Sequence, residues 1–232
     1  IGSTGFTAVT EDFHLICLAR FINGFSGAVV LICGTSLIFS RLEKFVTPDL
    51  RLVHFAGFGL GMALSSLGVI FCEYISLDWK GQWLMMGIIG FLLFLPILYL
   101  TPNQQKTTIK PSLKEITIQG GFILLCIGYA CFGFGYIIYG TFIADLIRSS
   151  ETFSGLENIA WLLSGIAAIP SAVVWQKIGK ITSIDLSLLL SSFVCSVGAS
   201  LLLFTDHPNI VLASCILYGF GIPGIVSLTL LE

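Results

Sequence analysis

Long uncharged runs alternate along this chain with short segments that carry its charges. Seven runs of 19 to 29 residues contain no Asp, Glu, Lys or Arg: 21–40, 52–72, 81–105, 116–144, 158–176, 186–205 and 208–231. About 20 apolar residues are enough for a helix to cross a bilayer. None of the runs shows the period-two alternation of a transmembrane strand, so each predicts a membrane-spanning helix. Residues 1–10 are also apolar but half as long, and predict part of an eighth span.

The charges between the runs predict how the spans are oriented. Three segments, 41–51, 101–115 and 177–185, hold eight of the eleven basic residues. If every run crosses once, these segments lie on one side, and the positive-inside rule makes that side cytoplasmic.

Composition excludes several classes of protein. Hydrophobic residues make up 56% of the chain and charged residues only 10%, whereas a soluble domain has roughly 25% charged residues. The net charge is −2, with no basic cluster to neutralise nucleic acid. The fold class predicted is therefore an all-α, polytopic helical membrane protein whose surroundings are the lipid bilayer.

The polar segment 101–115 divides the spans into two groups. Residues 1–100 contain one partial and three full spans, and residues 116–232 contain four. The chain begins at Ile1 within an apparent helix and ends at Glu232 as a span finishes. We therefore expect a fragment of a longer bundle.

Signals for catalysis are absent from the sequence. It contains no HExxH, GxSxG, P-loop or CxxC motif, and its three histidines lie in separate spans or loops. Seven scattered cysteines are typical of packing residues in apolar helices. The sequence predicts no enzyme, no metal site and no cofactor.

Arg20 is the most informative charge because it opens the first full span. A guanidinium at membrane depth costs about 2.5–3.5 kcal/mol at the helix centre and less near an end. It either faces an aqueous cavity and pairs with a substrate or carboxylate, or it extends to the outer headgroups. Asn23 follows three residues later.

Tyrosines cluster in the fourth full span. Tyr129, Tyr136 and Tyr139 lie on neighbouring faces of a helix, with Thr141 beyond them. Their rings and hydroxyls either line a pocket or pack between helices. Tyr218 in the last span and Trp161, one turn inside an earlier span, are further candidates for a cavity wall.

Glycines are candidates for close helix packing or for hinges. These are Gly24, Gly27, Gly57, Gly61, Gly133, Gly135 and Gly219. Gly57 and Gly61 form a small-xxx-small pair. Gly219 and Pro223 interrupt the last span, and predict either a broken helix or a kink.

Several of these motifs resemble the major facilitator superfamily of secondary transporters. Arg20-x-x-Asn23-Gly24-x-x-Gly27 resembles its fourth helix, and Asp78-Trp79-Lys80-x-x-Trp83 the entry to its sixth. The run Gly133-Phe-Gly135-Tyr136-x-x-Tyr139-Gly140-Thr141-Phe142 is similar to the YbfB/YjiJ-like branch. The resemblance places residues 1–100 at the end of helix three and helices four to six. Segment 101–115 would be the linker between the halves, and 116–232 would be helices seven to ten.

The resemblance implies a cavity between two helical halves that opens alternately to each side. It implies a monomeric secondary transporter of a small organic solute or drug in a bacterial inner membrane, with coupling to protons as a further hypothesis. Arg20, Asn23, Tyr136, Tyr139, Thr141, Trp161 and Tyr218 would bind the substrate or couple its transport. Two alternatives stay open: a transporter remnant that is nonfunctional or regulatory, and an intramembrane enzyme acting on lipid.

Overall fold

The computed structural model describes residues 2–42, 50–100, 120–150, 152, 155–203 and 207–230. Most of the predicted cytoplasmic segment 41–51 and all of segment 101–115 lie outside these residues. The basic residues that carried the orientation prediction there, such as Lys44 and Lys110, are therefore not described.

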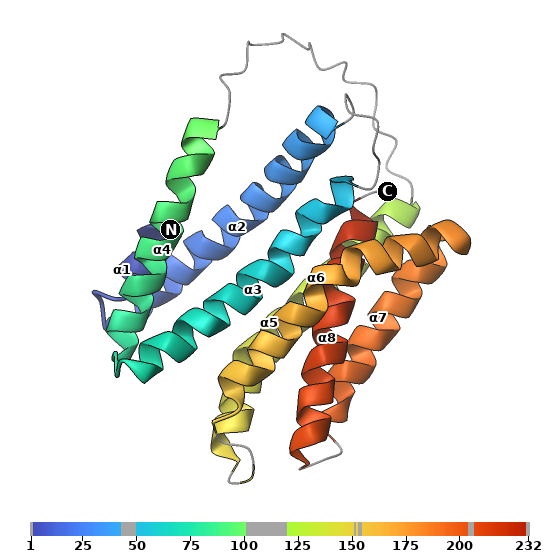
Figure 1. Ribbon diagram of the computed structural model, residues 1–232. Helices are drawn as coiled ribbons and strands as arrows, with labels where there is room; N and C mark the ends of the chain where they lie inside the picture. Colours follow the sequence, from blue (N-terminus) through green and yellow to red (C-terminus); the bar gives the residue numbers. More distant parts are fainter. Residues whose placement is uncertain are drawn as a thin grey trace.

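Every regular element in the described ranges is an α-helix, and Figure 1 shows their arrangement. Seven of these helices are long and apolar enough to cross a membrane. This confirms the all-α fold class and the seven full spans predicted from the uncharged runs. The elements are α1 (Gly2–Phe6), α2 (Phe13–Leu42), α3 (Leu50–Tyr74), α4 (Trp79–Leu100), α5 (Gly120–Ser149), α6 (Glu157–Ile181), α7 (Ile184–Leu201) and α8 (Pro208–Thr229).

The helices extend beyond the uncharged runs at several ends. The first full span was expected from Phe21, but α2 begins at Phe13 and includes Arg20. Similarly, α5 continues past Ala144 to Ser149. A charge ends a run of apolar residues, but it does not interrupt the backbone hydrogen bonds of a helix, so hydropathy underestimates helix length.

Three helix pairs form the centre of the molecule. α6 packs against α3 and α8, and α8 packs against α7 (Figure 1). α1 and α4 lie together beside α2, away from this centre. α3 belongs to the helices before segment 101–115 and α6 to those after it, so their contact joins the two groups of helices.

Glycines allow the central helices to approach closely. A Cβ atom at Gly59 of α3 would lie 2.6 Å from the carbonyl oxygen of Gly165 in α6. At Gly219 of α8 it would meet the backbone of Ser164 even more closely. Only a residue without a side chain fits at such backbone contacts.

Most of the glycines predicted to pack helices together do not lie at these close backbone contacts. A Cβ atom at Gly24, Gly27, Gly57, Gly61, Gly133 or Gly135 would meet no other described atom within 4 Å. On α3 the close contact is made by Gly59, between the two members of the predicted pair. Gly59 is two residues from each of them, which turns it by about 200° to the other side of the helix, so the spacing alone could not select the packing face. Gly219 does lie in a close contact.

The last span is one continuous helix. α8 runs from Pro208 to Thr229 with Pro223 inside it, so the break considered from the sequence is not present. Near Pro223, the carbonyl oxygen of Phe220 accepts hydrogen bonds from Trp175 Nε1 at 2.9 Å and from Ser171 Oγ at 2.5 Å. Side chains of α6 therefore stabilise α8 where its proline removes a backbone donor.

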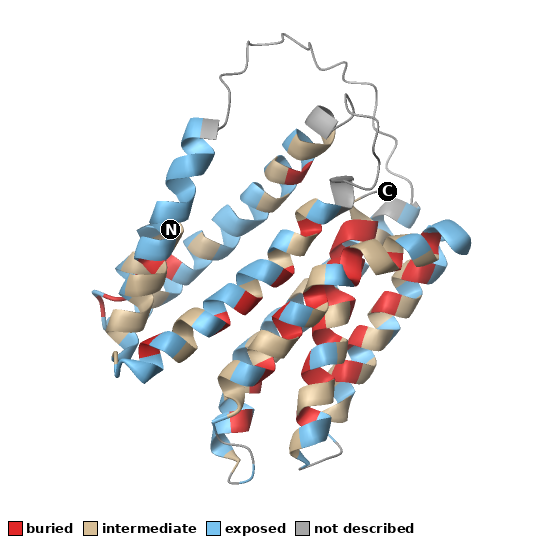
Figure 2. Ribbon diagram, viewed as in Figure 1, coloured by how far each residue is buried: buried red, intermediate tan, exposed pale blue. Residues whose placement is uncertain are grey.

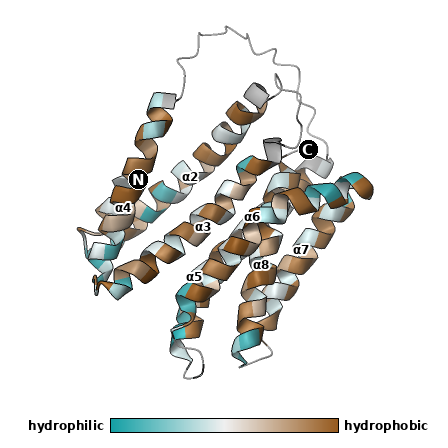
Figure 3. Cartoon of the chain, viewed as in Figure 1, coloured by the Kyte–Doolittle hydropathy of each residue, from teal (hydrophilic) through white to brown (hydrophobic). Residues whose placement is uncertain are grey.

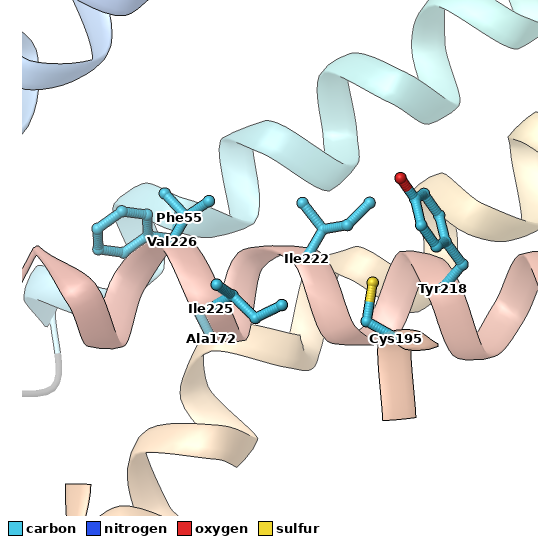
Figure 4. Close-up of a cluster of buried hydrophobic side chains, with 7 residues drawn as sticks. All are labelled: Phe55, Ala172, Cys195, Tyr218, Ile222, Ile225 and Val226. Carbon is cyan, nitrogen blue, oxygen red and sulfur yellow. The ribbon is translucent and has the colours of Figure 1, made fainter. Parts of the chain in front are cut away.

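Burial is concentrated on α8. Figure 2 shows buried residues along α8 and mostly exposed ones on α2 and α4. The main core cluster joins Phe55 of α3 to Tyr218, Ile222 and Val226 of α8 (Figure 4). Hydrophobic residues cover the long helices over most of their length, as Figure 3 shows, so their exposed faces suit lipid.

Charged side chains pair near the ends of helices. Lys80 Nζ donates to Glu11 Oε1 at 2.5 Å, and this hydrogen bond holds the pKa of the Glu11 carboxyl below its usual value. Asn158 Nδ2 donates to Glu73 Oε2 at 2.7 Å, which connects the start of α6 with the end of α3. These contacts keep charge out of the apolar middle of the bundle.

Candidate functional site

A cavity of about 600 Å³ lies where α2, α3, α5 and α8 meet. Cavities of this size hold one drug-sized molecule. Two of its helices precede segment 101–119 in the chain and two follow it. The lining residues are Gly24, Gly27, Ala28, Val30, Leu31, His54, Phe55, Gly57, Phe58, Tyr136, Ile137, Pro223 and Val226.

The walls of the cavity are mainly aliphatic and aromatic. The rings of Phe58 and Tyr136 lie 6.4 Å apart and are inclined by 53°, so α3 and α5 each contribute one aromatic face. On α2, Gly24 and Gly27 contribute no side chains and form a glycine surface beside Ala28, Val30 and Leu31. This combination leaves room for a flat, apolar molecule.

His54 is the imidazole in this lining. Its Nε2 atom lies 3.1 Å from the hydroxyl oxygen of Thr35, which is buried on α2. His54 was not among the residues predicted from the sequence, because a single histidine has no spacing pattern. His54 is also only the second residue of the candidate span Val53–Tyr74, near the membrane surface, so its position gave no signal of a functional role.

Tyr136, Tyr139 and Tyr218 come together as one cluster. The rings of Tyr139 and Tyr218 are stacked with centroids 3.6 Å apart, and Tyr218 donates a hydrogen bond to the carbonyl oxygen of Tyr136 at 3.2 Å. The Tyr139 hydroxyl lies 3.1 Å from Ser214 Oγ. Tyr139 and Tyr218 thus join α5 to α8, while Tyr136 faces the cavity. A smaller cavity of about 220 Å³ separately borders Gly135, Tyr136 and Tyr218.

Thr141 and Trp161 do not lie in the lining of the 600 Å³ cavity. Thr141 is exposed on α5, about two turns before the helix ends at Ser149. The Trp161 ring packs beside Gly140 and a second core cluster around Ile143 and Val211. The structure therefore separates these two candidates from the others.

Arg20 and Asn23 lie with α1 and α4. The Arg20 guanidinium carbon is 3.9 Å from the centre of the Trp83 ring. The Asn23 side-chain oxygen accepts a hydrogen bond from Ser3 Oγ at 2.8 Å, and its nitrogen donates to Thr4 Oγ1 at 3.2 Å. Arg20 is one helical turn before Gly24, so this polar group lies next to the cavity but outside its lining.

The contact between Arg20 and Trp83 can be measured by a double-mutant cycle. We expect Arg20→Gln and Trp83→Leu each to lower the thermal stability of the purified protein, with a coupling energy of about 0.5–1 kcal/mol. Unfolding in detergent gives all four values. A coupling energy of zero would mean that the guanidinium extends to the headgroups instead.

Comparison with known proteins gives one family for nearly the whole chain. The family described as "Uncharacterised MFS-type transporter YbfB" matches residues 3–231. No curated protein and no solved structure matches the chain.

Proposed function

Because the chain belongs to the family of MFS-type transporters described by YbfB, we propose that it carries a small organic solute through the cavity between α2, α3, α5 and α8. Family membership identifies the protein as an integral membrane transporter rather than an enzyme. It also confirms the resemblance seen in the sequence.

The observation that carries the proposal is the position of the cavity. α2 and α3 come from the first group of helices, and α5 and α8 from the second. A movement of one group against the other would change the access to this space from each side of the membrane, as alternating access requires. The solute would then contact Tyr136 and the glycine surface of α2.

The α3–α6 contact supports such a movement. It joins the two groups of helices through Gly59 and Gly165, which bring the two backbones together without large interlocking side chains. Small sliding movements of packed helices are a common element of domain closure. We propose this contact as the pivot of the transport cycle.

Several finer assignments are also part of the proposal. Tyr136, Gly24, Gly27 and Gly57 shape the binding space. Arg20, Asn23, Tyr139, Thr141, Trp161 and Tyr218 stay predictions for binding or coupling. We place the protein as a monomer in a bacterial inner membrane, with segments 41–51, 101–115 and 177–185 in the cytoplasm, and we propose proton coupling as the energy source.

Filling the cavity is the direct test of this route. Gly57→Leu adds a side chain into the lining, where a Cβ atom meets no described atom within 4 Å. We expect it to reduce uptake of a transported solute by about tenfold or more because the binding space is lost, while the protein still folds. Uptake is measured in membrane vesicles that contain the full-length protein, with a panel of neutral, anionic and cationic organic solutes.

Gly61→Leu is the matched control. Gly61 lies one turn along the same helix, also meets no described atom within 4 Å, and is not in the lining. It should transport like the unmodified protein. If both variants lose uptake equally, the assigned cavity is not the transport route. If the unmodified protein takes up no solute of the panel, the result favours the transporter remnant. A solute whose uptake is independent of pH and of Arg20→Lys or Arg20→Gln would contradict proton coupling.

A further inference from the structure

The lining of the cavity also limits which solutes it can hold. Resting on the proposed function, we propose that its substrate is an uncharged, largely aromatic molecule with one hydrogen-bonding group, which His54 binds. Four features of the described residues support this assignment: the absence of charge, the aromatic walls, the glycine surface and the position of the imidazole.

Charge is the first feature. Among the lining residues that the structure describes, none is an Asp, Glu, Lys or Arg. An ionised solute would lose its hydration on entering and would find no opposite charge there. An uncharged solute avoids this loss, so the lining favours it over an anion or a cation of the same shape.

Arg20 is a charged residue that lies close to the cavity on α2. It lies one turn from Gly24, but its guanidinium is placed over the Trp83 ring on α4. The neighbouring Asn23 amide is hydrogen-bonded to Ser3 and Thr4 of α1. These contacts direct both polar side chains toward α1 and α4, and not toward the cavity between α2, α3, α5 and α8.

Shape is the second feature. Phe58 and Tyr136 present ring faces from α3 and α5, and Phe55 adds a third aromatic side chain to the wall. Gly27 and Gly57 leave space between α2 and α3 in which an added Cβ would meet no described atom within 4 Å. A flat ring system can lie against the glycine surface while its edge or face contacts the aromatic residues.

His54 then supplies the polar contact. Its Nε2 atom is paired with the Thr35 hydroxyl, which fixes the orientation of the ring at the wall. The second ring nitrogen is the atom that we assign to the solute. A polar group in a mainly apolar lining fixes the orientation of a ligand without requiring it to be charged.

The test uses four probes that share a naphthalene ring: naphthol, naphthoate, naphthylmethylammonium and methylnaphthalene. Binding to the full-length protein in lipid nanodiscs is measured by calorimetry, with Gly57→Leu as the reference for partition into lipid. We expect saturable binding of naphthol to the unmodified protein and to Gly61→Leu, and binding to Gly57→Leu at least about tenfold weaker. Naphthoate and naphthylmethylammonium should bind at least about tenfold more weakly than naphthol.

His54→Phe tests the polar contact because it keeps a ring of similar size. It should weaken naphthol about fivefold and leave methylnaphthalene unchanged, since methylnaphthalene has no group to bind the imidazole. Equal weakening of both probes would overturn the role of His54. Naphthoate binding as tight as naphthol, and lost in Arg20→Gln, would overturn the uncharged class in favour of an anion site.

Two outcomes distinguish this inference from the proposed function. If vesicles accumulate a charged solute and Gly57→Leu prevents it, the transport route stands and the solute class is wrong. If naphthol binds as expected but neither it nor any solute of the panel is moved, the solute class stands and the transport function is wrong. Equal binding of all probes to the unmodified protein and to Gly57→Leu would mean that lipid, and not the cavity, takes them up.

Discussion

Gly59→Ala is expected to weaken the contact between the two groups of helices more than alanine at any other glycine of α3. The new Cβ atom would lie 2.5 Å from the backbone nitrogen of Ile169 and 2.6 Å from the carbonyl oxygen of Gly165. Both atoms belong to the backbone of α6, so no side-chain rotation can relieve the overlap. We expect a loss of about 3 kcal/mol in stability, seen as a lower unfolding temperature of the purified protein in detergent.

Gly61→Ala is the matched control on the same helix. Its Cβ atom meets no described atom within 4 Å. Since alanine favours a helix over glycine by up to about 1 kcal/mol, this variant should be as stable as the unmodified protein or more so. If the two variants unfold at the same temperature, α3 and α6 do not pack as the structure shows.

Tyr218→Ala is expected to have the second large effect. The Tyr218 side chain is only 3% exposed, and its ring stacks on Tyr139 across the α5–α8 contact. Removing a buried aromatic side chain leaves a cavity and typically costs 3–5 kcal/mol, so we expect a loss of about 3 kcal/mol. The measurement is again thermal unfolding in detergent.

Tyr218→Phe separates the ring from its hydroxyl. It keeps the stacked ring but removes the hydrogen bond to the Tyr136 carbonyl oxygen. One such hydrogen bond contributes about 1 kcal/mol, so this variant should lose about a third as much as Tyr218→Ala. A Phe variant as unstable as the Ala variant would show that the hydroxyl, and not the stacking, holds α5 against α8.

These two contacts also bear on the transport proposal. Gly59 joins the groups of helices, and Tyr218 holds the helix that contributes Pro223 and Val226 to the cavity. If a variant at Gly59 or Tyr218 is stable but transports slowly, the contact made by that residue moves during the transport cycle. If a variant affects stability only, the uptake measured per folded protein molecule will be unchanged.

The sequence was sufficient to predict that this chain is a bundle of membrane-spanning helices. The seven uncharged runs correspond to α2 through α8, because the free energy of placing a segment in a bilayer depends on its length and composition. The family was also visible from short motifs such as Gly133-Phe-Gly135-Tyr136, and the match over residues 3–231 confirms it.

The tertiary structure alone decided which side chains meet. It selected Gly59 over Gly57 and Gly61 for helix contact, placed Arg20 over Trp83, and brought His54 to the cavity. In a soluble helix the apolar face reveals which side is buried. Here the lipid and the protein interior are equally apolar, so the sequence of a helix that is hydrophobic on all sides does not show which face packs against other helices. That orientation, and with it the composition of the cavity, depends on backbone contacts between helices far apart in the sequence.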